Sequence, residues 1–380
     1  MKIGVDIRVL MDKQYSGISE YAYYLLREFL ATDDGNEYIF YYNSFHKIDP
    51  KLFTWCNDRV TFKNTTWPNK IFNYILQKFL AWPKLDSITG PVDAFWSPHF
   101  NFSCFGANAG KKILTVHDLS FLRYPEFFSA RKNFWHKGLN IKKLIKKYDK
   151  IIAISENTKI DLMELLQVPE EKITVIYSGL NQETINLTAE EAKEFKEKHS
   201  LNERFILYLG AIEPRKNVGG LIEAYNLLRD KHLPLTDYQL LLAGSSGWKN
   251  KSVYKKVSDS LYRDDVKFLG YVSRAERNWL YDNASLFIYP SYYEGFGFPP
   301  LEAMSHGLAT ITSDVSSLPE VVGSAALTIN PYSTSDLARA IETLLLDVDL
   351  RHKYEARGLE RAKLFNWQTT ATGYLKLFKK

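Results

Sequence analysis

The 380-residue sequence contains only two cysteines, Cys56 and Cys104, and no long apolar run. Two cysteines are too few for a disulfide framework or a cysteine-rich metal site. No apolar stretch approaches the roughly 20 residues that a helix needs to cross a bilayer. The N-terminal run carries Asp6 and Arg8 among its apolar residues, which is typical of a first strand and not of a signal peptide. We therefore expect a cytoplasmic globular protein.

Signatures of several enzyme classes are absent as well. There is no HExxH motif, no cluster of cysteine and histidine and no DxD-like carboxylate set, so the sequence predicts no metal site. The GxSxG elbow, the GxxxxGK[ST] phosphate loop and the GxGxxG dinucleotide fingerprint are missing too. A net charge of +5 is too small an excess to predict a nucleic-acid partner. We expect neither a metal nor a resident cofactor.

Apolar runs alternate with helical patterns along the whole chain, and this alternation predicts parallel sheets covered by helices on both faces. A polar, glutamate-rich stretch over residues 181–202 interrupts the alternation. We predict an α/β fold with two doubly wound domains, residues 1–180 and 181–365, and a ligand site in the cleft between them.

The predicted elements follow the same pattern in both domains. The first domain has predicted strands at Lys2–Arg8, Glu37–Asn43, Ala94–Ser97, Lys112–Val116, Lys150–Ile154 and Lys172–Ile176, and helices at Ser19–Ala31, Ala130–Lys147 and Thr158–Leu166. The second has strands at Phe205–Leu209, Tyr238–Ala243, Val266–Leu269, Leu286–Tyr289 and Ala309–Ser313, and helices at Val218–Arg229, Val253–Tyr262, Arg274–Asn283, Ser335–Asp347 and Leu350–Phe365.

The most informative segment, SYYEGFGFPPLEAMSHG at residues 291–307, contains Glu294 and Glu302 with seven residues between them. Its glycines favour a tight loop, and its two prolines predict the first turn of a helix that contains Glu302 and ends at the last glycine. Solvated surface glutamates are the ordinary explanation of such a pair. The apolar, glycine and proline residues around them favour a ligand site instead.

The helix N-terminus and loop amides of this segment favour a diphosphate. Two carboxylates would repel that diphosphate, so we expect Glu294 and Glu302 to contact the neutral hydroxyls of a sugar and a ribose. An acid and nucleophile pair of the hydrolase type is the alternative.

A turn with the sequence GAIEPRKN, residues 210–217, follows the predicted strand Phe205–Leu209. Arg215 and Lys216 in this turn can neutralise a diphosphate, the arginine by pairing with two oxygens and the lysine as a point charge. A cationic surface turn capped by Asn217 is the alternative.

Two weaker signals lie in the first domain. Gly17 follows the first predicted strand, where glycines that approach phosphates usually lie, although a tight turn explains it equally well. His117 stands at the end of another predicted strand, where it can place an imidazole in the cleft or make a structural hydrogen bond.

Lysines and arginines gather around aromatic residues over 131–150, and a second aromatic-rich helical stretch covers 67–82. Two amphipathic helices packed on the sheet would explain both stretches, and a helical wheel places Phe134, Ile141 and Tyr148 on one face. The alternative is a surface that contacts an anionic membrane.

These segments together resemble those of the retaining glycosyltransferases of family 4, which have the GT-B fold of two Rossmann-like domains. The resemblance covers nearly the whole chain, and EGFGFPPLEAMSHG is its most specific part. The HDLSFLRYPE stretch is similar to bacterial mannosyltransferases. The resemblance implies that residues 1–180 bind the acceptor, that 181–365 bind the nucleotide-sugar donor, and that 366–380 form a helix crossing back to the first domain.

The resemblance also implies roles for individual residues. Glu294 and His117 are the implied catalytic residues near the reacting sugar. Many family members carry an arginine where this chain has Ala211, so either Arg215 supplies that charge alone or the diphosphate lies differently. The implied donor-binding residues are Gly17, Arg215, Lys216, Tyr271, Glu294, Gly295, Phe296, Gly297 and Glu302, with Glu302 on the ribose and Tyr271 near the base.

The implied reaction moves a hexose, with mannose favoured, from a GDP- or UDP-linked donor to an acceptor hydroxyl with retained anomeric configuration. The acceptor would be a glycan or lipid-linked precursor in polysaccharide biosynthesis, met at the inner face of the membrane. Two alternatives stay open. A GT-B-fold epimerase or phosphorylase would need no such acceptor, and a nucleotide-sugar-binding scaffold would show no turnover.

Overall fold

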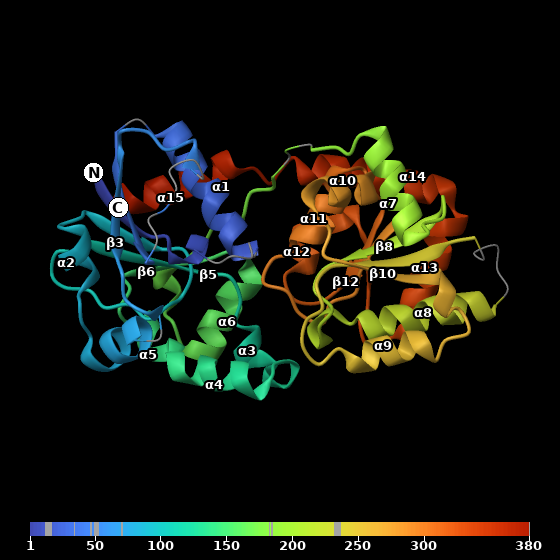
Figure 1. Cartoon of the computed structure of the whole chain (residues 1–380), viewed down its shortest axis with the longest axis horizontal. Coiled ribbons are helices and arrows are strands. Elements are labelled where there is room, and N and C mark those ends of the chain that lie inside the picture. Colours follow the sequence, from blue (N-terminus) through green and yellow to red (C-terminus); the bar gives the residue numbers. More distant parts are fainter. Residues whose placement is uncertain are drawn as a thin grey trace. The chain divides into compact units, whose positions relative to one another are not determined.

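The computed structural model describes residues 1–11, 17–33, 35–45, 48, 53–69, 71–181, 183, 185–231 and 237–379. These residues divide into two compact units, which Figure 1 shows with their elements labelled. The first unit contains Met1–Arg123, Ala130–Gly179 and Asn366–Lys380, and the second contains Tyr124–Ser129 and Leu180–Phe365. The short segment Tyr124–Ser129 therefore belongs to the second unit although it lies in the first half of the sequence.

The first unit is built on a seven-stranded sheet with the order β3-β2-β1-β4-β5-β6-β7. Every neighbouring pair of strands in it is parallel. The strands are β1 (Lys2–Asp6), β2 (Glu37–Asn43), β3 (Val60–Thr65), β4 (Ala94–Ser97), β5 (Lys111–Val116), β6 (Lys150–Ala153) and β7 (Ile173–Val175).

The second unit is built on a six-stranded sheet with the order β10-β9-β8-β11-β12-β13, also parallel throughout. The strands are β8 (Phe205–Leu209), β9 (Gln239–Ala243), β10 (Val266–Gly270), β11 (Leu286–Tyr289), β12 (Thr310–Ser313) and β13 (Leu327–Ile329). The two parallel sheets confirm the predicted α/β class with two Rossmann-like folds.

Helices connect the strands in both units. In the first unit they are η1 (Arg8–Met11), α1 (Gly17–Thr32), η3 (Ile71–Leu80), α2 (Leu85–Thr89), α3 (Ser120–Arg123), α4 (Ala130–Leu139), α5 (Ile141–Ile145), α6 (Glu156–Leu166), η5 (Glu170–Lys172) and α15 (Trp367–Lys379). In the second they are η4 (Pro125–Phe127), α7 (Ala189–His199), η6 (Pro214–Lys216), α8 (Val218–Asp230), α9 (Lys251–Ser258), η7 (Arg263–Asp265), α10 (Arg274–Asn283), α11 (Phe298–Ser305), α12 (Leu318–Val322), η8 (Gly323–Ala325), α13 (Thr334–Leu346) and α14 (Val348–Ala362).

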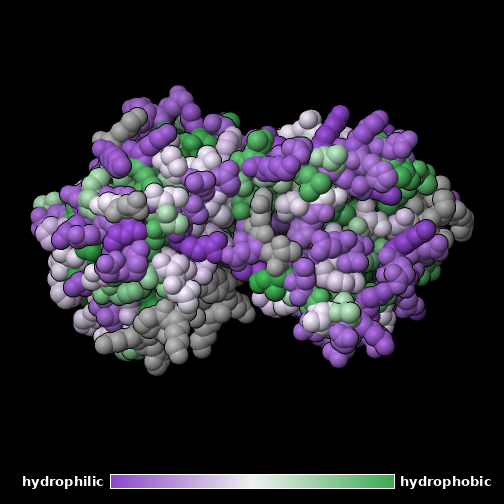
Figure 2. All heavy atoms as spheres, turned by 90° about the horizontal axis from the view of Figure 1, so that it is seen from above, coloured by the Kyte–Doolittle hydropathy of each residue, from purple (hydrophilic) through white to green (hydrophobic). Residues whose placement is uncertain are grey.

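The strands form the core of each unit because their side chains are buried on both faces, as parallel sheets require. All four residues of β4 and all four of β11 are buried. Figure 1 shows α8 and α9 below the second sheet and α10 and α11 above it, so helices cover both of its faces. On the face seen in Figure 2, polar residues predominate and apolar residues are scattered among them.

The C-terminal helix α15 packs into the first unit. The Tyr374 hydroxyl lies 2.6 Å from the hydroxyls of Tyr21 and Thr115, and its ring packs edge-on against Trp96. A Cβ at Gly179 would lie 2.4 Å from the backbone nitrogen of the first helical residue, Trp367. Glycine is therefore required at 179 by close approach of the two chain segments.

The predicted helix Ala130–Lys147 is wrong as a single element. It is divided into α4 and α5 at Asn140, which has φ +48 and whose side chain accepts a hydrogen bond from the Lys143 backbone nitrogen. Asparagine tolerates this left-handed conformation and is a favoured N-cap. The break also separates residues that a continuous helix would align, since Phe134 is 78% exposed while Ile141 is buried.

Three elements differ from their sequence patterns in other ways. β3 is a half-exposed edge strand with polar residues, and β13 has only three residues, so neither shows the apolar run that predicts a strand. The aromatic-rich stretch over 67–82 contains η3, which is a π-helix. Within η3, Phe72 is buried but Ile75, Phe79 and Leu80 are exposed.

Candidate functional site

β8 and β11 are parallel neighbours at the point where the second sheet reverses its strand order. β9 and β10 extend from β8 on one side, and β12 and β13 extend from β11 on the other. The turns that follow β8 and β11 therefore leave the sheet at the same edge. In open α/β sheets, ligands bind beyond the carboxyl ends of the strands at such a switch point. The two segments that the sequence singles out, 210–217 and 291–307, follow these two strands.

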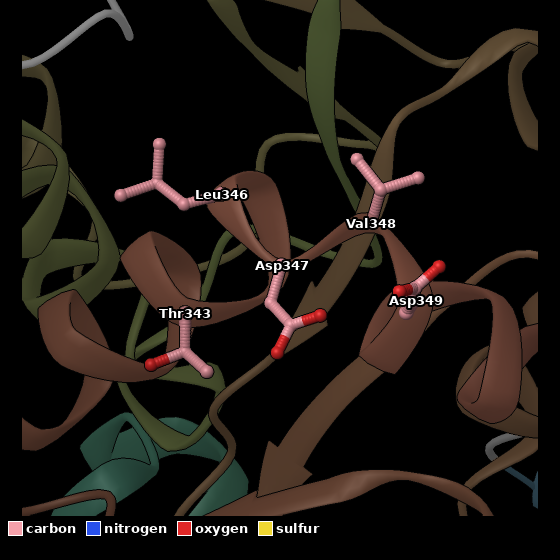
Figure 3. Close-up of a pocket in the computed structure, with 5 residues that line it drawn as sticks. All are labelled: Thr343, Leu346, Asp347, Val348 and Asp349. Carbon is pink, nitrogen blue, oxygen red and sulfur yellow. The ribbon is translucent and has the colours of Figure 1, made fainter.

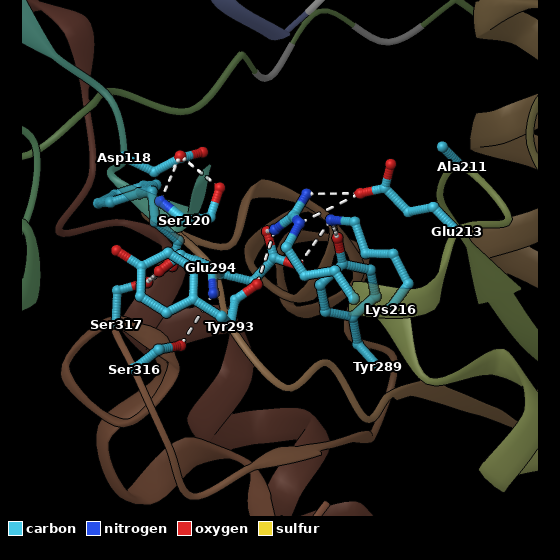
Figure 4. Close-up of polar contacts among 12 residues, drawn as sticks. Asp118, Ser120, Ala211, Glu213, Lys216, Tyr289, Tyr293, Glu294, Ser316 and Ser317 are labelled. Carbon is cyan, nitrogen blue, oxygen red and sulfur yellow. Dashed lines mark hydrogen bonds and ion pairs between the residues drawn. The ribbon is translucent and has the colours of Figure 1, made fainter. Parts of the chain in front are cut away.

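Four charged side chains from the two turns form one ion-pair group, the switch-point cluster, which consists of Glu213, Arg215, Lys216 and Glu294. The two carboxylate oxygens of Glu294 accept from Lys216 Nζ at 2.6 Å and from Arg215 Nη1 at 2.9 Å (Figure 4). Arg215 also donates to a Glu213 oxygen at 2.9 Å and to the Tyr293 carbonyl oxygen at 2.6 Å. The structure thus brings together three predicted site residues, Arg215, Lys216 and Glu294.

The switch-point cluster is buried, and burial acts on its charge states. Burial alone would raise the pKa of the Glu294 carboxyl, but the cations of Arg215 and Lys216 outweigh it and lower this pKa to about 2. Burial lowers the pKa of the Lys216 ammonium, Arg215 lowers it further, and Glu294 acts in the opposite direction. Glu294 is therefore ionised at neutral pH, so its carboxylate accepts hydrogen bonds and has no proton to donate.

The backbone around Glu294 is held by two serines of the loop after β12. The Glu294 backbone nitrogen donates to Ser316 Oγ at 3.0 Å. Ser317 Oγ donates to the carbonyl oxygens of Glu294 and Phe296 at 2.9 and 2.8 Å. Gly297 has φ +116, a conformation that favours glycine, and it caps the N-terminus of α11. These contacts fix the loop that carries Glu294 and the orientation of the N-terminus of α11.

Helix α11 begins at Phe298, so Pro299 and Pro300 lie in its first turn as predicted. Phe298 is its first residue and the prolines are second and third, so Glu302 is the fifth residue and lies beyond the predicted first turn. The helix ends at Ser305, two residues before Gly307, which has φ +69. Glu302 contacts residues of α10, and the sequence pattern does not predict these contacts.

Glu302 contacts α10 and lines a polar cavity. Its carboxylate accepts from the Tyr281 hydroxyl at 3.0 Å and lies 3.5 Å from the Arg277 guanidinium. The cavity has a volume of about 470 Å³. It is lined by Asn181, Glu183, Arg277, Asn278, Tyr281, Asp282, Glu302, Ser305, His306, Leu359, Ala362 and Lys363. The described partners of Glu302 are thus different from those of Glu294, and the two glutamates do not belong to one ion-pair group.

The remaining predicted residues of the second unit have contrasting environments. Tyr271 follows β10, and its side chain is 84% exposed. Gly295 is buried in the Glu294 loop. The Phe296 ring is also buried, and it packs against Phe298 and Phe365 with centroid distances of 5.1 and 5.7 Å. Phe296 therefore anchors the loop in the core of the unit.

In the first unit, His117 follows β5 and is buried. Its Nε2 lies 2.8 Å from the Pro98 carbonyl oxygen. A carbonyl oxygen only accepts, so Nε2 carries the hydrogen and Nδ1 of the neutral ring can accept one. Burial lowers the pKa of His117 to about 4, and the Pro98 hydrogen bond and Asp118 oppose this shift without reversing it. The imidazole is therefore neutral at physiological pH.

Gly17 is the first residue of α1 and is exposed. A Cβ at this position would meet no atom within 4 Å. The preceding residues of the predicted YSGIS loop, Tyr15 and Ser16, lie outside the described residues. Packing within the described part of the protein gives no steric reason for glycine at 17, which leaves room for a ligand to approach.

No sequence pattern singles out Glu213 or Ser317. Glu213 is 4% exposed and Ser317 is fully buried. Glu213 precedes two cations in the turn, a pattern that also suits a solvated surface pair. Ser317 lies in no recognisable motif, and its contacts arise from the pairing of β11 with β12. An acid two residues before Arg215 was the one signal available in the sequence.

A second cavity lies where α13 meets α14, with a volume of about 510 Å³. Figure 3 shows its lining residues, Thr343, Leu346, Asp347, Val348 and Asp349. None of the predicted site residues is among them. This cavity is therefore separate from the switch-point cluster.

Two general features complete the description. Within the described ranges, each helix is too short or too polar to span a bilayer. In that same part of the chain, no group of three or more histidine, cysteine, aspartate or glutamate side chains is arranged to hold a metal ion.

Two solved structures share the fold over the whole chain. The sucrose-phosphate synthase of Thermosynechococcus elongatus superimposes with a TM-score of 0.73 at 20% identity, covering 100% of this chain and 98% of that one. HepE of Anabaena, solved with UDP-glucose, gives a TM-score of 0.71 at 15% identity, with 100% and 99% covered.

Sequence comparison identifies the family. The model "Glycosyltransferase Family 4" matches residues 15–184, and "Glycosyl transferases group 1" matches residues 189–361. O-antigen chain mannosyltransferase B of Escherichia coli is 32% identical over 71% of this chain and 70% of its own. The serotype-specific mannosyltransferase WbdA of Escherichia coli is 33% identical over 69% of this chain but only 32% of its own. The chain therefore belongs to the family 4 glycosyltransferases and, as its sequence predicts, is a glycosyltransferase with the GT-B fold.

Proposed function

We propose that the protein transfers a hexose, with mannose as the first candidate, from a GDP- or UDP-linked donor to a hydroxyl group of a growing glycan, with retained anomeric configuration. The observation that carries this proposal is the switch-point cluster, in which buried Lys216 and largely buried Arg215 meet an ionised carboxylate beside a helix N-terminus. The mannosyltransferases among the relatives support the choice of sugar and a polysaccharide product.

In this proposal the second unit binds the donor diphosphate. Arg215 and Lys216 neutralise its charge, and the amides of Gly295, Phe296 and Gly297 at the start of α11 add hydrogen bonds. Charge develops on the diphosphate as the sugar departs, and fixed cations in a buried site stabilise it without reorganisation. Glu294, which is ionised, accepts hydrogen bonds from the sugar hydroxyls.

The nucleoside is proposed to bind near α10. Glu302 accepts from the ribose hydroxyls, and Tyr281 and Arg277 hold its carboxylate in place. The polar lining of the adjoining cavity suits a ribose, which is rich in hydroxyls. The backbone at Tyr271, in the turn after β10, contacts the base.

The first unit is proposed to bind the acceptor and to act on the reacting sugar through His117. The neutral imidazole accepts a hydroxyl hydrogen at Nδ1, because the Pro98 carbonyl occupies Nε2–H. Gly17 leaves space for a phosphate to approach the backbone at α1. The acceptor attacks from the face that the diphosphate leaves, and the departing phosphate takes its proton, so this scheme uses no protein nucleophile.

The protein is also proposed to contact the inner face of a membrane that carries a lipid-linked acceptor. η3 exposes Ile75, Phe79 and Leu80. α4 lies against η3, because a Cβ at Gly138 would be 3.6 Å from Lys78 Nζ. α4 and α5 of the same unit expose cations, and exposed cations together with exposed apolar residues suit an anionic lipid surface. The membrane-facing residues are Ile75, Phe79, Leu80, Arg131, Phe134, Lys137 and Lys143.

The first test is thermal stabilisation by GDP, UDP and ADP. A ligand that binds only the folded state at a hundredfold excess over its dissociation constant stabilises it by about 2.7 kcal/mol. We expect a clear rise in the melting temperature with GDP or UDP alone, and a smaller rise in Glu302→Ala. No rise with any of the three nucleotides would refute the proposed donor.

The second test is product analysis with GDP-mannose and UDP-hexoses, with and without glycan acceptors. Acceptor-dependent transfer with retained configuration, unaffected by a chelator, is expected. Release of an epimerised nucleotide-sugar without an acceptor would contradict transfer, and tight binding without turnover across acceptors would indicate a scaffold.

A further inference from the structure

Glu213 is a buried acid whose carboxylate faces a cation from its own turn. The residue is 4% exposed and immediately precedes η6. Its Oε1 accepts from Arg215 Nε at 3.1 Å and from Arg215 Nη2 at 2.9 Å. Both bonds end on the same Glu213 oxygen, so two donors of one guanidinium edge are held at a single point. Glu213 therefore holds Arg215 more firmly than a single ion pair would.

The other carboxylate of the switch-point cluster contacts a different part of the same guanidinium. Arg215 Nη1 donates to Glu294 at 2.9 Å and to the Tyr293 carbonyl oxygen at 2.6 Å. Glu294 shares its second oxygen with Lys216 Nζ at 2.6 Å. Glu294 thus accepts from each of two cations, whereas Glu213 accepts twice from one.

The charge balance of the cluster determines how a diphosphate can bind to its cations. The cluster contains two formal positive and two formal negative charges, so its cations are already neutralised by its own carboxylates. A diphosphate must compete with a carboxylate for Nη1 and Nζ. Glu294 is the carboxylate in that position, and it can turn to sugar hydroxyls. Glu213 accepts from Nε and Nη2 of Arg215, so its carboxylate continues to occupy this edge of the guanidinium.

We propose that Glu213 is a positioning residue: it holds the Arg215 guanidinium in place while Nη1 exchanges Glu294 for a donor phosphate oxygen. This inference rests on the proposed function, since it needs a diphosphate at the switch-point cluster. Glu213 touches no substrate in this scheme and acts only through Arg215.

A positioning role and a role in charge balance alone predict opposite changes in diphosphate affinity for Glu213→Ala. If Glu213 only balanced charge, removing it would leave the cluster one charge more positive and would tighten diphosphate binding in every variant. If Glu213 positions Arg215, the result depends on whether a hydrogen-bond acceptor is kept. Glu213→Gln removes the charge and keeps an acceptor oxygen, whereas Glu213→Ala removes both.

The experiment measures the dissociation constants of GDP and UDP by calorimetry, and kcat with the active donor, for wild type, Glu213→Gln and Glu213→Ala. We expect Glu213→Gln to bind the nucleotide as tightly as wild type or more tightly. We expect Glu213→Ala to bind about tenfold more weakly and to lose more in kcat than in affinity, because misplacement of a charged group affects the transition state most.

Two outcomes would overturn the inference while leaving the proposed function standing: tighter binding in both variants, or wild-type affinity and kcat in Glu213→Ala. Binding of neither nucleotide by wild type would overturn both. Should Glu213→Ala fail to fold, Arg215→Lys replaces it, since lysine keeps the charge but lacks the Nε and Nη2 pair that donates to Glu213. Arg215→Lys is expected to show the same loss, and wild-type behaviour of that variant would overturn the inference.

Discussion

The protein carries two groups of cations in opposite settings. Lys216 is buried, the Arg215 side chain is only 13% exposed, and both are held by acids from two turns of one sheet. Arg131, Lys137 and Lys143 lie exposed on two short helices of the first unit. A buried cation has been moved out of water and is retained only with well-placed partners, so its position is fixed. An exposed cation keeps its water and contributes mainly to the surface field.

This difference separates two kinds of function. A fixed, desolvated charge can stabilise a specific charge in a reacting ligand, because the surroundings need not reorganise. A solvated charge attracts an anionic surface over about 8–10 Å and is screened by salt. The same residue types therefore suit catalysis in one place and docking in the other, and substitutions should affect the two properties separately.

The largest effect is expected for Lys216→Ala. Lys216 Nζ lies 2.6 Å from Glu294, and its loss leaves that carboxylate with less compensation in a buried site. Removing one preorganised donor from an active site costs about 10²–10³ in rate. We expect kcat/KM to fall about 100-fold or more, with a lower melting temperature because a buried pair is broken.

The matched control is Lys256→Ala. Lys256 pairs with Glu223 on the surface of the same unit, where ion pairs contribute little. Its kcat/KM and melting temperature should stay close to those of wild type. A loss of less than about tenfold in Lys216→Ala would remove the buried lysine from the proposed diphosphate site.

A smaller effect, on the free energy of unfolding, is expected when the pH is lowered. Because the folded-state pKa of Glu294 lies near 2, below its ordinary value of 4.5, ionised Glu294 stabilises the fold above pH 4.5. That contribution, about 3 kcal/mol by linkage, is lost as the pH falls from 4.5 toward 2. The arginine partner stays protonated throughout this window and adds no slope.

The measurement compares melting temperatures of wild type and Glu294→Gln between pH 7 and pH 3. The difference between the two proteins should shrink on acidification. Glu170→Gln is the control, because Lys159 lowers the pKa of Glu170 as well but water screens this exposed pair. An equal shrinkage in Glu170→Gln would show that acid acts on the protein generally and not on the switch-point cluster.

The contrast between buried and exposed cations also marks the limit of prediction from sequence. The strands β8 and β11 were predicted with the observed bounds, because their apolar runs are continuous. The bond between Lys216 and Glu294 joins residues 78 positions apart and depends on β8 and β11 being neighbours. Apolar patterns place both motifs at the same end of the sheet but do not determine the strand order, so the direct ion pair between them is not predicted.

The helix predicted over residues 130–147 is wrong because the conformation of a single residue divides it. The periodicity over 130–147 favours one helix, yet the left-handed conformation of Asn140 divides it and exposes Phe134. The edge strand β3 has polar, partly exposed residues and β13 has only three residues, so neither has a buried face that shows a pattern. These local choices depend on packing against the rest of the unit, which the sequence pattern does not specify.

Reversing the charge of exposed cations is expected to have the smallest effect on catalysis. It is expected to have the clearest effect on membrane binding. The triple variant Arg131→Glu, Lys137→Glu and Lys143→Glu should lose binding to phosphatidylglycerol vesicles, by about fivefold for each charge removed. Transfer to a soluble acceptor should stay near the wild-type rate, because none of the three residues belongs to the proposed donor or acceptor machinery.

The control reverses Lys251, Lys255 and Lys353, which are exposed in the second unit. This variant has the same net charge as the first, so it should keep vesicle binding if the local surface matters and lose it if net charge alone does. Phe79→Ser tests the apolar part separately. It should weaken binding to vesicles in high salt, where charge attraction is screened and burial of apolar surface is not. Equal binding by all of these variants would exclude α4, α5 and η3 as the membrane surface and leave the exposed cations without a role in docking.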